Sequence, residues 1–265
     1  MRLAWMTDIH LNFLDSEAVT RFLRRVAKME VDRLLIAGDI GEADSLLNYL
    51  SAIHDLCPVP IYFVLGNHDY YRGSVEYLRS KLPRFLAANP RLTWLGDSPV
   101  ISLTDSTALI GHDSWADGRL GDYAKSTVEL NDFALIGEFL GCSKFDRLSV
   151  MQKFAEQAAK HFEVTLPQAL SKHSRVIIVT HVPPFEGATW HRGKISAPDW
   201  LPLFSCKVVG EVLSSIMQQH PEKQAVVLCG HTHSGGEYYP LPNLQVLTGT
   251  ARYGHPKIQQ LLTID

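Results

Sequence analysis

The sequence predicts a single α/β domain built on a parallel β-sheet, and two observations support this prediction. Short apolar runs typical of buried strands alternate with longer segments whose apolar residues recur at helical spacing. Each strand-like run ends in a polar stretch, as expected where parallel strands deliver ligand-binding loops at their carboxyl ends. The chain of 265 residues can form one sizeable core, and no linker composition divides it. We therefore expect one domain over residues 1–265.

Composition narrows the class of protein. With 46% hydrophobic and 20% charged residues, the chain has the composition of an ordinary soluble enzyme. Its net charge is −3 and no basic stripe is present, so electrostatics provide no reason to expect nucleic acid or a membrane surface as partner. No apolar run approaches the roughly 18 residues of a membrane span. Four scattered cysteines without a CxxC pair are expected to be reduced core thiols: Cys57, Cys142, Cys206 and Cys229.

The first third of the chain predicts three strands connected by helices. Strands are expected at residues 2–7, 34–37 and 61–65. Asp15 or Ser16 can cap a helix that runs to about residue 29. Further helices are expected from Leu46 up to Pro58 and near 74–87. Parallel strands need such crossover helices, so this spacing predicts βαβ units.

The remainder is less regular. Shorter strands are expected at about 92–95, 98–104 and 107–111. Residues from about 113 to 174 break the alternation and are helical in character, so we interpret them as a helical insertion that forms a lid or cap. Alternation then resumes, and the last three segments are expected to form antiparallel edge strands. The expected elements are strands at 175–179 and 225–229, a helix at 205–219, and edge strands at 238–239, 244–247 and 258–264.

Seven nitrogen or oxygen donors follow five of the predicted strands. They are Asp8, His10, Asp39, Asn67, His181, His231 and His233. Residues two apart in an extended chain point to the same side, which applies to Asp8 and His10 and to His231 and His233. A set without thiolates suits Mn, Fe, Co, Zn or Mg. Seven ligands exceed the needs of one catalytic ion and fit two ions that share one carboxylate.

Each motif alone has an ordinary structural explanation, such as a capping aspartate in a turn. The complete ordered series, however, resembles the calcineurin-like metallophosphoesterase superfamily over nearly the whole chain. That pattern is Asp-x-His, Gly-Asp, Gly-Asn-His-Asp, a lone His and Gly-His-x-His, here Asp8-x-His10, Gly38-Asp39, Gly66-Asn67-His68-Asp69, His181 and Gly230-His231-x-His233.

The resemblance implies an αββα sandwich with a dinuclear metal centre at one edge. It assigns Asp39 as the bridging ligand and leaves His68 unligated, facing the substrate. By position, one ion would be held by Asp8, His10 and His233, and the other by Asn67, His181 and His231. Manganese is the metal we expect, with iron, zinc, cobalt or magnesium as alternatives.

One departure from the family pattern is informative. The protein serine/threonine phosphatases continue the second motif into Asp-Arg-Gly, whereas this chain has Glu42 at that point and no arginine. This argues against a phosphoprotein substrate. Glu42, Asp44 and Asp69 remain candidates for the residue that orients His68.

The predicted reaction is hydrolysis of a small-molecule phosphate monoester or diester by a hydroxide that bridges the metals. His68 would donate a proton to the leaving oxygen, assisted by Asp69 as the second catalytic residue. Two alternatives are a nuclease acting on single strands and a non-catalytic scaffold with the same fold. The absence of a basic channel speaks against the first, and the intact ligand set speaks against the second.

The position of the first two predicted ligands bears on the cellular location of the protein. Removal of a signal peptide would delete Asp8 and His10, so we expect a cytoplasmic protein.

We expect substrate choice to depend on the insertion and on the loop at 184–200, since function-specific segments are often added loops. Candidate substrate contacts are Trp115, Trp190, Arg192 and Lys194, with Tyr70, Tyr71, Arg252 and Tyr253 as weaker ones. The oligomeric state is not predicted.

Overall fold

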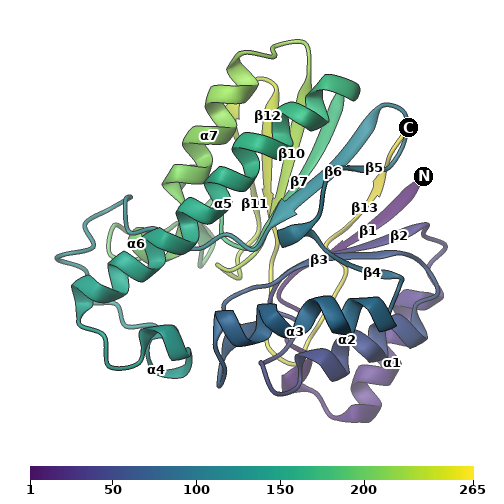
Figure 1. Cartoon of the computed structure of the whole chain (residues 1–265), viewed down its shortest axis with the longest axis horizontal. Helices are drawn as coiled ribbons and strands as arrows, with labels where there is room; N and C mark the ends of the chain where they lie inside the picture. Colours follow the sequence, from purple (N-terminus) through teal and green to yellow (C-terminus); the bar gives the residue numbers. More distant parts are fainter.

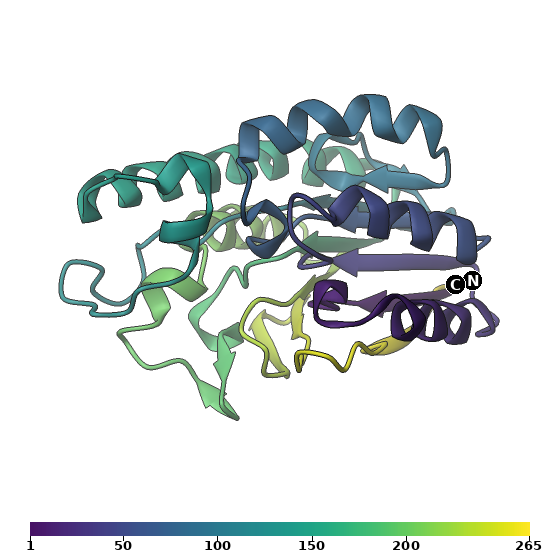
Figure 2. The ribbon, with the colours of Figure 1, turned by 90° about the horizontal axis from the view of Figure 1, so that it is seen from below.

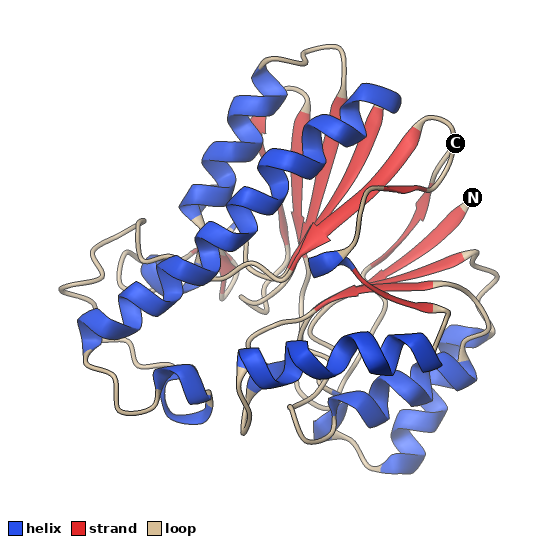
Figure 3. Ribbon diagram, viewed as in Figure 1, coloured by secondary structure: helices blue, strands red, loops and turns tan.

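The computed structural model describes residues 1–265 and shows two β-sheets packed face to face (Figure 1). The first sheet has the strand order β13-β1-β2-β3-β4, and the second has the order β11-β12-β10-β7-β6-β5. Helices cover the outer face of each sheet, as Figure 3 shows in blue around the red strands. The αββα sandwich implied by the resemblance is confirmed.

Parallel pairing dominates both sheets. β1 to β4 run parallel, and β6, β7, β10 and β12 do so in the second sheet. The strands are β1 (Arg2–Met6), β2 (Arg33–Ala37), β3 (Ile61–Val64), β4 (Leu92–Trp94), β5 (Ile101–Ser102), β6 (Thr107–His112), β7 (Arg175–Thr180), β8 (Trp190–His191), β9 (Lys194–Ile195), β10 (Gln224–Cys229), β11 (Gly236–Leu241), β12 (Leu244–Thr248) and β13 (Gln260–Thr263).

The helices occupy two outer layers. α1, α2 and α3 follow the first three strands on one side, and α5 and α7 pack together on the other (Figure 1). The helices are α1 (Ser16–Ala27), α2 (Leu46–Leu56), α3 (Val75–Ala88), α4 (Asp132–Leu135), α5 (Lys144–Lys172), α6 (Leu201–Phe204) and α7 (Lys207–Gln218). As expected, Asp15 caps α1 by accepting a hydrogen bond from the backbone N–H of Ala18 (2.7 Å).

The strands are apolar on both faces because both faces are covered. In β1, Leu3 and Trp5 belong to the core between the two sheets, whereas Ala4 and Met6 belong to the larger core beneath the helices. A strand buried on both sides has no polar face, so its sequence reads as a continuous apolar run. This explains why the apolar runs in the sequence predicted the positions of these strands closely.

Some predictions need correction. β12 pairs parallel with β10 and antiparallel with β11, so it is an internal strand rather than an edge strand. Within 98–104 only Ile101–Ser102 is a strand. The segment 113–174 is helical as expected, but the second half of α5 packs on β6, β7 and α7 as part of the outer layer. The part that lies beyond the ends of the sheets is therefore shorter than predicted.

None of the helices combines the length and apolar character that spanning a bilayer requires.

The carboxyl ends of β1, β2 and β3 lie at the same edge of the sandwich as those of β7 and β10. Backbone hydrogen bonds join the loops directly, from Asp8 to the carbonyl of Gly38 (3.0 Å) and from Gly230 to the carbonyl of His181 (2.9 Å). The two sheets thus bring distant polar motifs together at one place.

The cysteines provide a test of the core. All four are free thiols, and Cys57, Cys206 and Cys229 are buried while Cys142 is partly exposed. Burial raises the pKa of Cys57 to about 11 and that of Cys206 and Cys229 to about 12, so these thiols stay protonated and unreactive. We expect a chromogenic disulfide reagent to modify one thiol quickly in the native protein and all four in denaturant. Rapid modification of several thiols without denaturant would contradict this core.

Candidate metal centre

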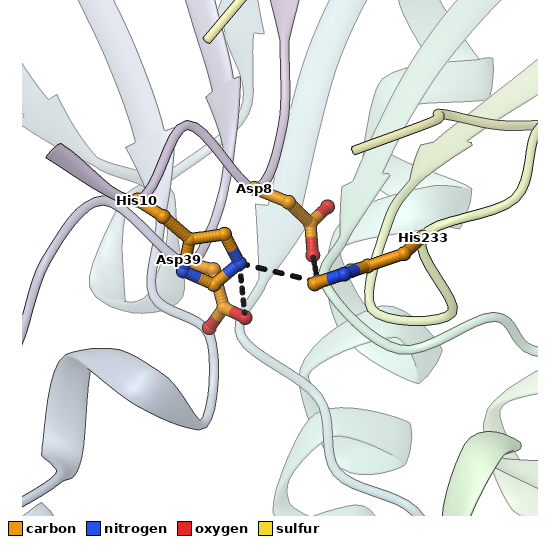
Figure 4. A group of neighbouring side chains, drawn as sticks. All are labelled: Asp8, His10, Asp39 and His233. Carbon is orange, nitrogen blue, oxygen red and sulfur yellow. Dashed lines mark hydrogen bonds and ion pairs between the residues drawn. The ribbon is translucent and has the colours of Figure 1, made fainter. Parts of the chain in front are cut away.

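The seven predicted donors converge on one point at the edge of the sandwich. Four of them, Asp8, His10, Asp39 and His233, place ligand atoms within 4.8 Å of one another (Figure 4). His233 Nε2 lies 3.1 Å from His10 Nε2 and 3.3 Å from Asp8 Oδ1. Metal bonds of about 2.0–2.2 Å at right angles place ligand atoms about 3 Å apart, so this spacing suits a shared cation.

The other three donors form a second group around the side chain of Asn67. Its Oδ1 atom lies 3.1 Å from His181 Nε2 and 3.0 Å from His231 Nδ1. The opposite ring nitrogens of both histidines face backbone carbonyls, those of Ala37 (2.9 Å) and Leu203 (3.0 Å). Carbonyls only accept, so those nitrogens carry the ring protons and a neutral ring presents its lone pair to Asn67.

This arrangement tests whether the residues fit a metal ion. In the neutral state, two imidazole lone pairs and an amide oxygen face one another, and all three are acceptors. Such a group is stable only with positive charge among them, supplied by a proton or a cation. The residues therefore fit a divalent metal ion bound between Asn67, His181 and His231.

Asp39 connects the two groups. Its Oδ2 atom lies 3.7 Å from His10 Nε2 in the first group, and its Oδ1 atom lies 3.4 Å from His181 Nε2 in the second. The carboxylate is buried, and its Oδ1 also accepts a hydrogen bond from the backbone N–H of His68 (2.9 Å). One oxygen of Asp39 thus faces each group, as the predicted bridging role requires.

The backbone at these positions is unusual. Eight non-glycine residues have positive φ angles, and five of them are predicted ligands: Asp8, His10, Asp39, His231 and His233. This left-handed conformation is costly for residues with a side chain and clusters at functional sites. Neighbouring glycines provide room, since a Cβ atom at Gly66 would overlap the Asp39 carboxylate and one at Gly230 would overlap that of Asp8.

The electrostatics of the site favour cations. Burial opposes ionisation of Asp39, yet the surrounding histidines hold its pKa well below the usual value. Burial likewise lowers the pKa of His181, but the Asp39 carboxylate outweighs it and raises that pKa to about 10. Burial dominates at His10 and His231, whose pKa values fall to about 4, so these rings are neutral and available as ligands at neutral pH.

Comparison with known proteins identifies the family. The profile of the calcineurin-like phosphoesterases matches residues 1–235. The chain belongs to this family. An uncharacterized metallophosphoesterase of Campylobacter jejuni is 32% identical over 87 residues, which cover 29% of this chain and 22% of that protein. The matched region is therefore a small part of the relative's length.

Solved structures agree on the fold. A dimetal phosphatase of Danio rerio is 16% identical, with a TM-score of 0.60 over 94% of this chain and 87% of that chain. A phosphopantetheinyl hydrolase of Mycobacterium tuberculosis is 13% identical, with a TM-score of 0.63 over 95% of this chain and 89% of that one. At these identities the matches support the fold.

His68 lies beside these predicted donors. Its Nε2 atom is 4.0 Å from Asp39 Oδ2, and its ring stacks on that of Tyr71 with 4.2 Å between ring centroids. The Nδ1 atom has no hydrogen-bond partner. Stacking on Tyr71, rather than a bond to a carboxylate, therefore sets the orientation of the ring.

None of the three acidic candidates for orienting His68 contacts its ring. Asp69 is buried and accepts hydrogen bonds from the backbone N–H groups of Ile40, Gly41 (both 2.8 Å) and Gly66 (2.9 Å). Burial and the nearby Asp39 carboxylate raise the pKa of Asp69 to about 7. Its contacts give it the role of joining two ligand loops, which corrects the expectation that it assists His68 directly.

Glu42 pairs instead with Arg72 and accepts a hydrogen bond from Asn12 (3.3 Å). Asp44 forms no hydrogen bond or ion pair. Glu42, at the position of the second acidic residue of the phosphoprotein phosphatases, is therefore engaged by Arg72 and Asn12 and not by His68.

The sequence analysis missed Asp132, which lies in the segment 113–174 (the middle segment) and supports the candidate metal centre. Its buried Oδ1 atom accepts hydrogen bonds from Asn67 Nδ2 (2.8 Å) and from the Tyr71 hydroxyl (2.7 Å). The first bond directs the Asn67 oxygen toward the histidines, and the second holds the ring that stacks on His68. No local pattern around Asp132 signals this role, because both partners are more than sixty residues away.

A cavity of about 270 Å³ opens over the site. The segment 113–174 lines it with Glu129, Asn131 and Asp132, and the 184–200 loop contributes His191. Trp115, in contrast, is buried against Phe139 and Phe154, so its expected role as a substrate contact is wrong. No lysine or arginine lines this cavity.

We expect Asp132→Ala to weaken metal binding on the Asn67 side, because the amide loses the acceptor that fixes its orientation. Residues that orient ligands are worth about 10- to 100-fold in affinity. Calorimetric titration with Mn²⁺ measures the loss, and Asp132→Asn should retain most of the affinity since its amide oxygen still accepts. Asp122→Ala, an exposed change in the same segment, serves as control. Unchanged binding of both ions by Asp132→Ala would refute this role.

Proposed function

We propose that this chain hydrolyses small-molecule phosphate monoesters or diesters with two divalent metal ions bound at the edge of the sandwich. One ion would be held by Asp8, His10 and His233, and the other by Asn67, His181 and His231. Asp39 would bridge them. The observation that carries the proposal is the meeting of two donor groups at the two oxygens of this single buried carboxylate.

When bound, the ions supply Lewis-acid activation of water and neutralise the charge of the phosphoryl oxygens. The chain itself prepares both groups of ligands. Backbone carbonyls select the ring tautomers of His181 and His231, and Asp132 orients the amide of Asn67. These contacts fix the donors before any ion arrives, which reduces the reorganisation needed for binding.

The charge of the cavity lining is a second reason, besides the activation of water, why the reaction would need metal ions. Asp39, Glu129 and Asp132 are the ionisable acids of the lining, and no lysine or arginine offsets them. A phosphate dianion would be repelled from this cavity without cations. The ions therefore serve substrate binding as well as chemistry, and a substrate with several phosphates would find no further positive charge inside.

His68 is the residue we assign to proton donation. It lies in the wall of the cavity, beside Asp39 but not among the donors that surround Asn67 or His233. A protonated imidazole there can donate its proton to the leaving oxygen of an ester and become neutral. Tyr71 keeps the ring in place by stacking, while the backbone N–H of His68 is engaged by Asp39.

A hydrolysis screen tests the proposal. Phosphomonoesters, cyclic nucleotides, dinucleotides and nucleotide-sugar pyrophosphates are incubated with Mn²⁺, Mg²⁺, Co²⁺ or Zn²⁺ supplied separately, and we expect turnover with Mn²⁺. Removal of metal by chelation should abolish it. Absence of turnover on every substrate, with two ions demonstrably bound, would instead favour a non-catalytic scaffold.

The bridging assignment predicts a difference between two substitutions. Asp39→Asn should remove nearly all bound metal, because loss of the shared carboxylate weakens both ions. Asp8→Asn should lose chiefly one ion, because Asp8 belongs to only one group. Elemental analysis of the purified variants after equal exposure to Mn²⁺ measures the difference. If Asp39→Asn still binds two ions as tightly as the parent protein, Asp39 is not the bridge.

The proton-donor assignment predicts an effect that depends on the leaving group. His68→Gln should keep both metals yet lose on the order of 10²–10⁴ in rate on an alkyl phosphoester, whose alkoxide needs a proton. It should lose much less on a nitrophenyl ester, since nitrophenolate leaves without help. The ligand substitution His231→Ala is the contrast and should depress both substrates together. A uniform loss for His68→Gln, or loss of metal, would rule out the assignment.

A further inference from the structure

A basic groove lies next to the metal centre, between α1 and the segment 254–257. Figure 2 shows this yellow C-terminal segment running beside the purple helix α1. The groove encloses about 790 Å³, compared with about 270 Å³ for the cavity over the metal site. Five of its eleven lining residues are lysines or arginines and none is acidic: Arg21, Arg24, Arg25, Lys28 and Lys257. This concentration contrasts with the net charge of −3 for the whole chain.

Local structural roles account for only part of this charge. Arg24 and Arg25 lie in the last turn of α1, where positive charge complements the helix dipole. Arg21 pairs with Glu17 on the same helix. Dipole stabilisation does not explain Lys257, which comes from a segment more than two hundred residues away in sequence and faces the same groove. Lys257 and Lys28 form no ion pair, so their charges are available to a ligand.

The groove adjoins the cavity over the metal site. Tyr253 lines the cavity over the metal site, and the next residue, Gly254, lines the groove. The ring of Tyr253 lies 4.4 Å from that of Phe13 and 4.7 Å from that of the predicted ligand His10. Both aromatic side chains are accessible, with 49% of Phe13 and 44% of Tyr253 exposed. An exposed aromatic pair thus lies beside the predicted ligand His10, and its Tyr253 directly precedes the groove residue Gly254.

We propose that this groove binds the backbone of a single-stranded nucleic acid. The strand's end would lie at the metal centre and a base would lie on the Phe13–Tyr253 pair. Positive grooves combined with accessible aromatic rings are the means by which proteins bind single strands without sequence preference. Three of the five cations are arginines, whose planar guanidinium groups match phosphate geometry.

Two other polyanions fit less well. An anionic membrane would meet a flat or convex basic face, whereas these cations line a concave groove. An acidic peptide would have no use for accessible aromatic rings beside a phosphoesterase centre. The end of the strand at the metal site rests on the proposed function, but binding in the groove does not. The structure thus contains a basic groove, whereas the sequence analysis found no basic channel.

Fluorescence anisotropy with a labelled single strand of about ten nucleotides tests the groove. For five cations we expect log K to fall with log salt at a slope of about −3.5, and Arg24→Gln/Lys257→Gln should reduce it to about −2.1. The same double variant should bind at least about tenfold more weakly at low salt. Lys153→Gln/Lys160→Gln on α5 removes equal charge from another exposed face and should bind like the parent protein.

Several outcomes would overturn the proposal. These are equal binding by the groove and control variants, tighter binding of a duplex than of the strand, or preference for phosphatidylserine vesicles or an acidic peptide. Phe13→Ser should weaken binding of the strand without changing the salt slope, and no effect would exclude stacking. The strand should inhibit hydrolysis of nitrophenyl phosphate in the parent protein, and the groove variant should need at least about tenfold more strand for the same inhibition. Failure of hydrolysis in every protein would refute the proposed function while leaving the anisotropy result interpretable.

Discussion

Two carboxylates, those of Asp8 and Asp39, are buried at the edge where both sheets end, and a buried charge is tolerated only among compensating partners. Histidines from three loops, His10, His68 and His181, provide that compensation around Asp39. The backbone N–H of His68 donates a hydrogen bond to Asp39, and that of His231 donates one to Asp8. The left-handed backbone of Asp39 and the glycines beside it follow from the same need, since they allow loops to approach a carboxylate closely. Removing this charge would leave the histidines without the group that holds them together.

The support of the site extends beyond the donors. Asp69 joins the loops after β2 and β3 through three backbone hydrogen bonds, and Asp132 controls both Asn67 and Tyr71. Both side chains are buried carboxylates that contact predicted ligands or their loops. The middle segment therefore has two functions: it lines the cavity with residues 129–132, and it orients a donor through one of them. A change in this segment can alter specificity and metal affinity together.

Charge is distributed unevenly around this centre. The cavity over the metal site is lined by acids and histidines without lysine or arginine, whereas the adjoining groove is strongly basic. Positive charge inside the cavity would compete with metal ions for the carboxylates, so its absence there is consistent with cation binding. Positive charge outside can attract an anionic ligand toward the site without that competition. Tyr253, whose ring lies 4.4 Å from that of Phe13, lines the cavity, and the next residue lines the groove.

The sequence by itself determined most of the central strands and the polar motifs that follow them. Strands buried on both faces appear as apolar runs, and a polar motif directly after each run is visible without any structure, as at Gly66-Asn67-His68. Only the tertiary structure decided which residues support those donors and where charge accumulates. Asp132 lies 65 residues from Asn67, and Lys257 lies far along the chain from α1, so no local spacing relates them. The pairing of β12 with β10 was hidden for the same reason, because register and neighbours depend on contacts between distant segments.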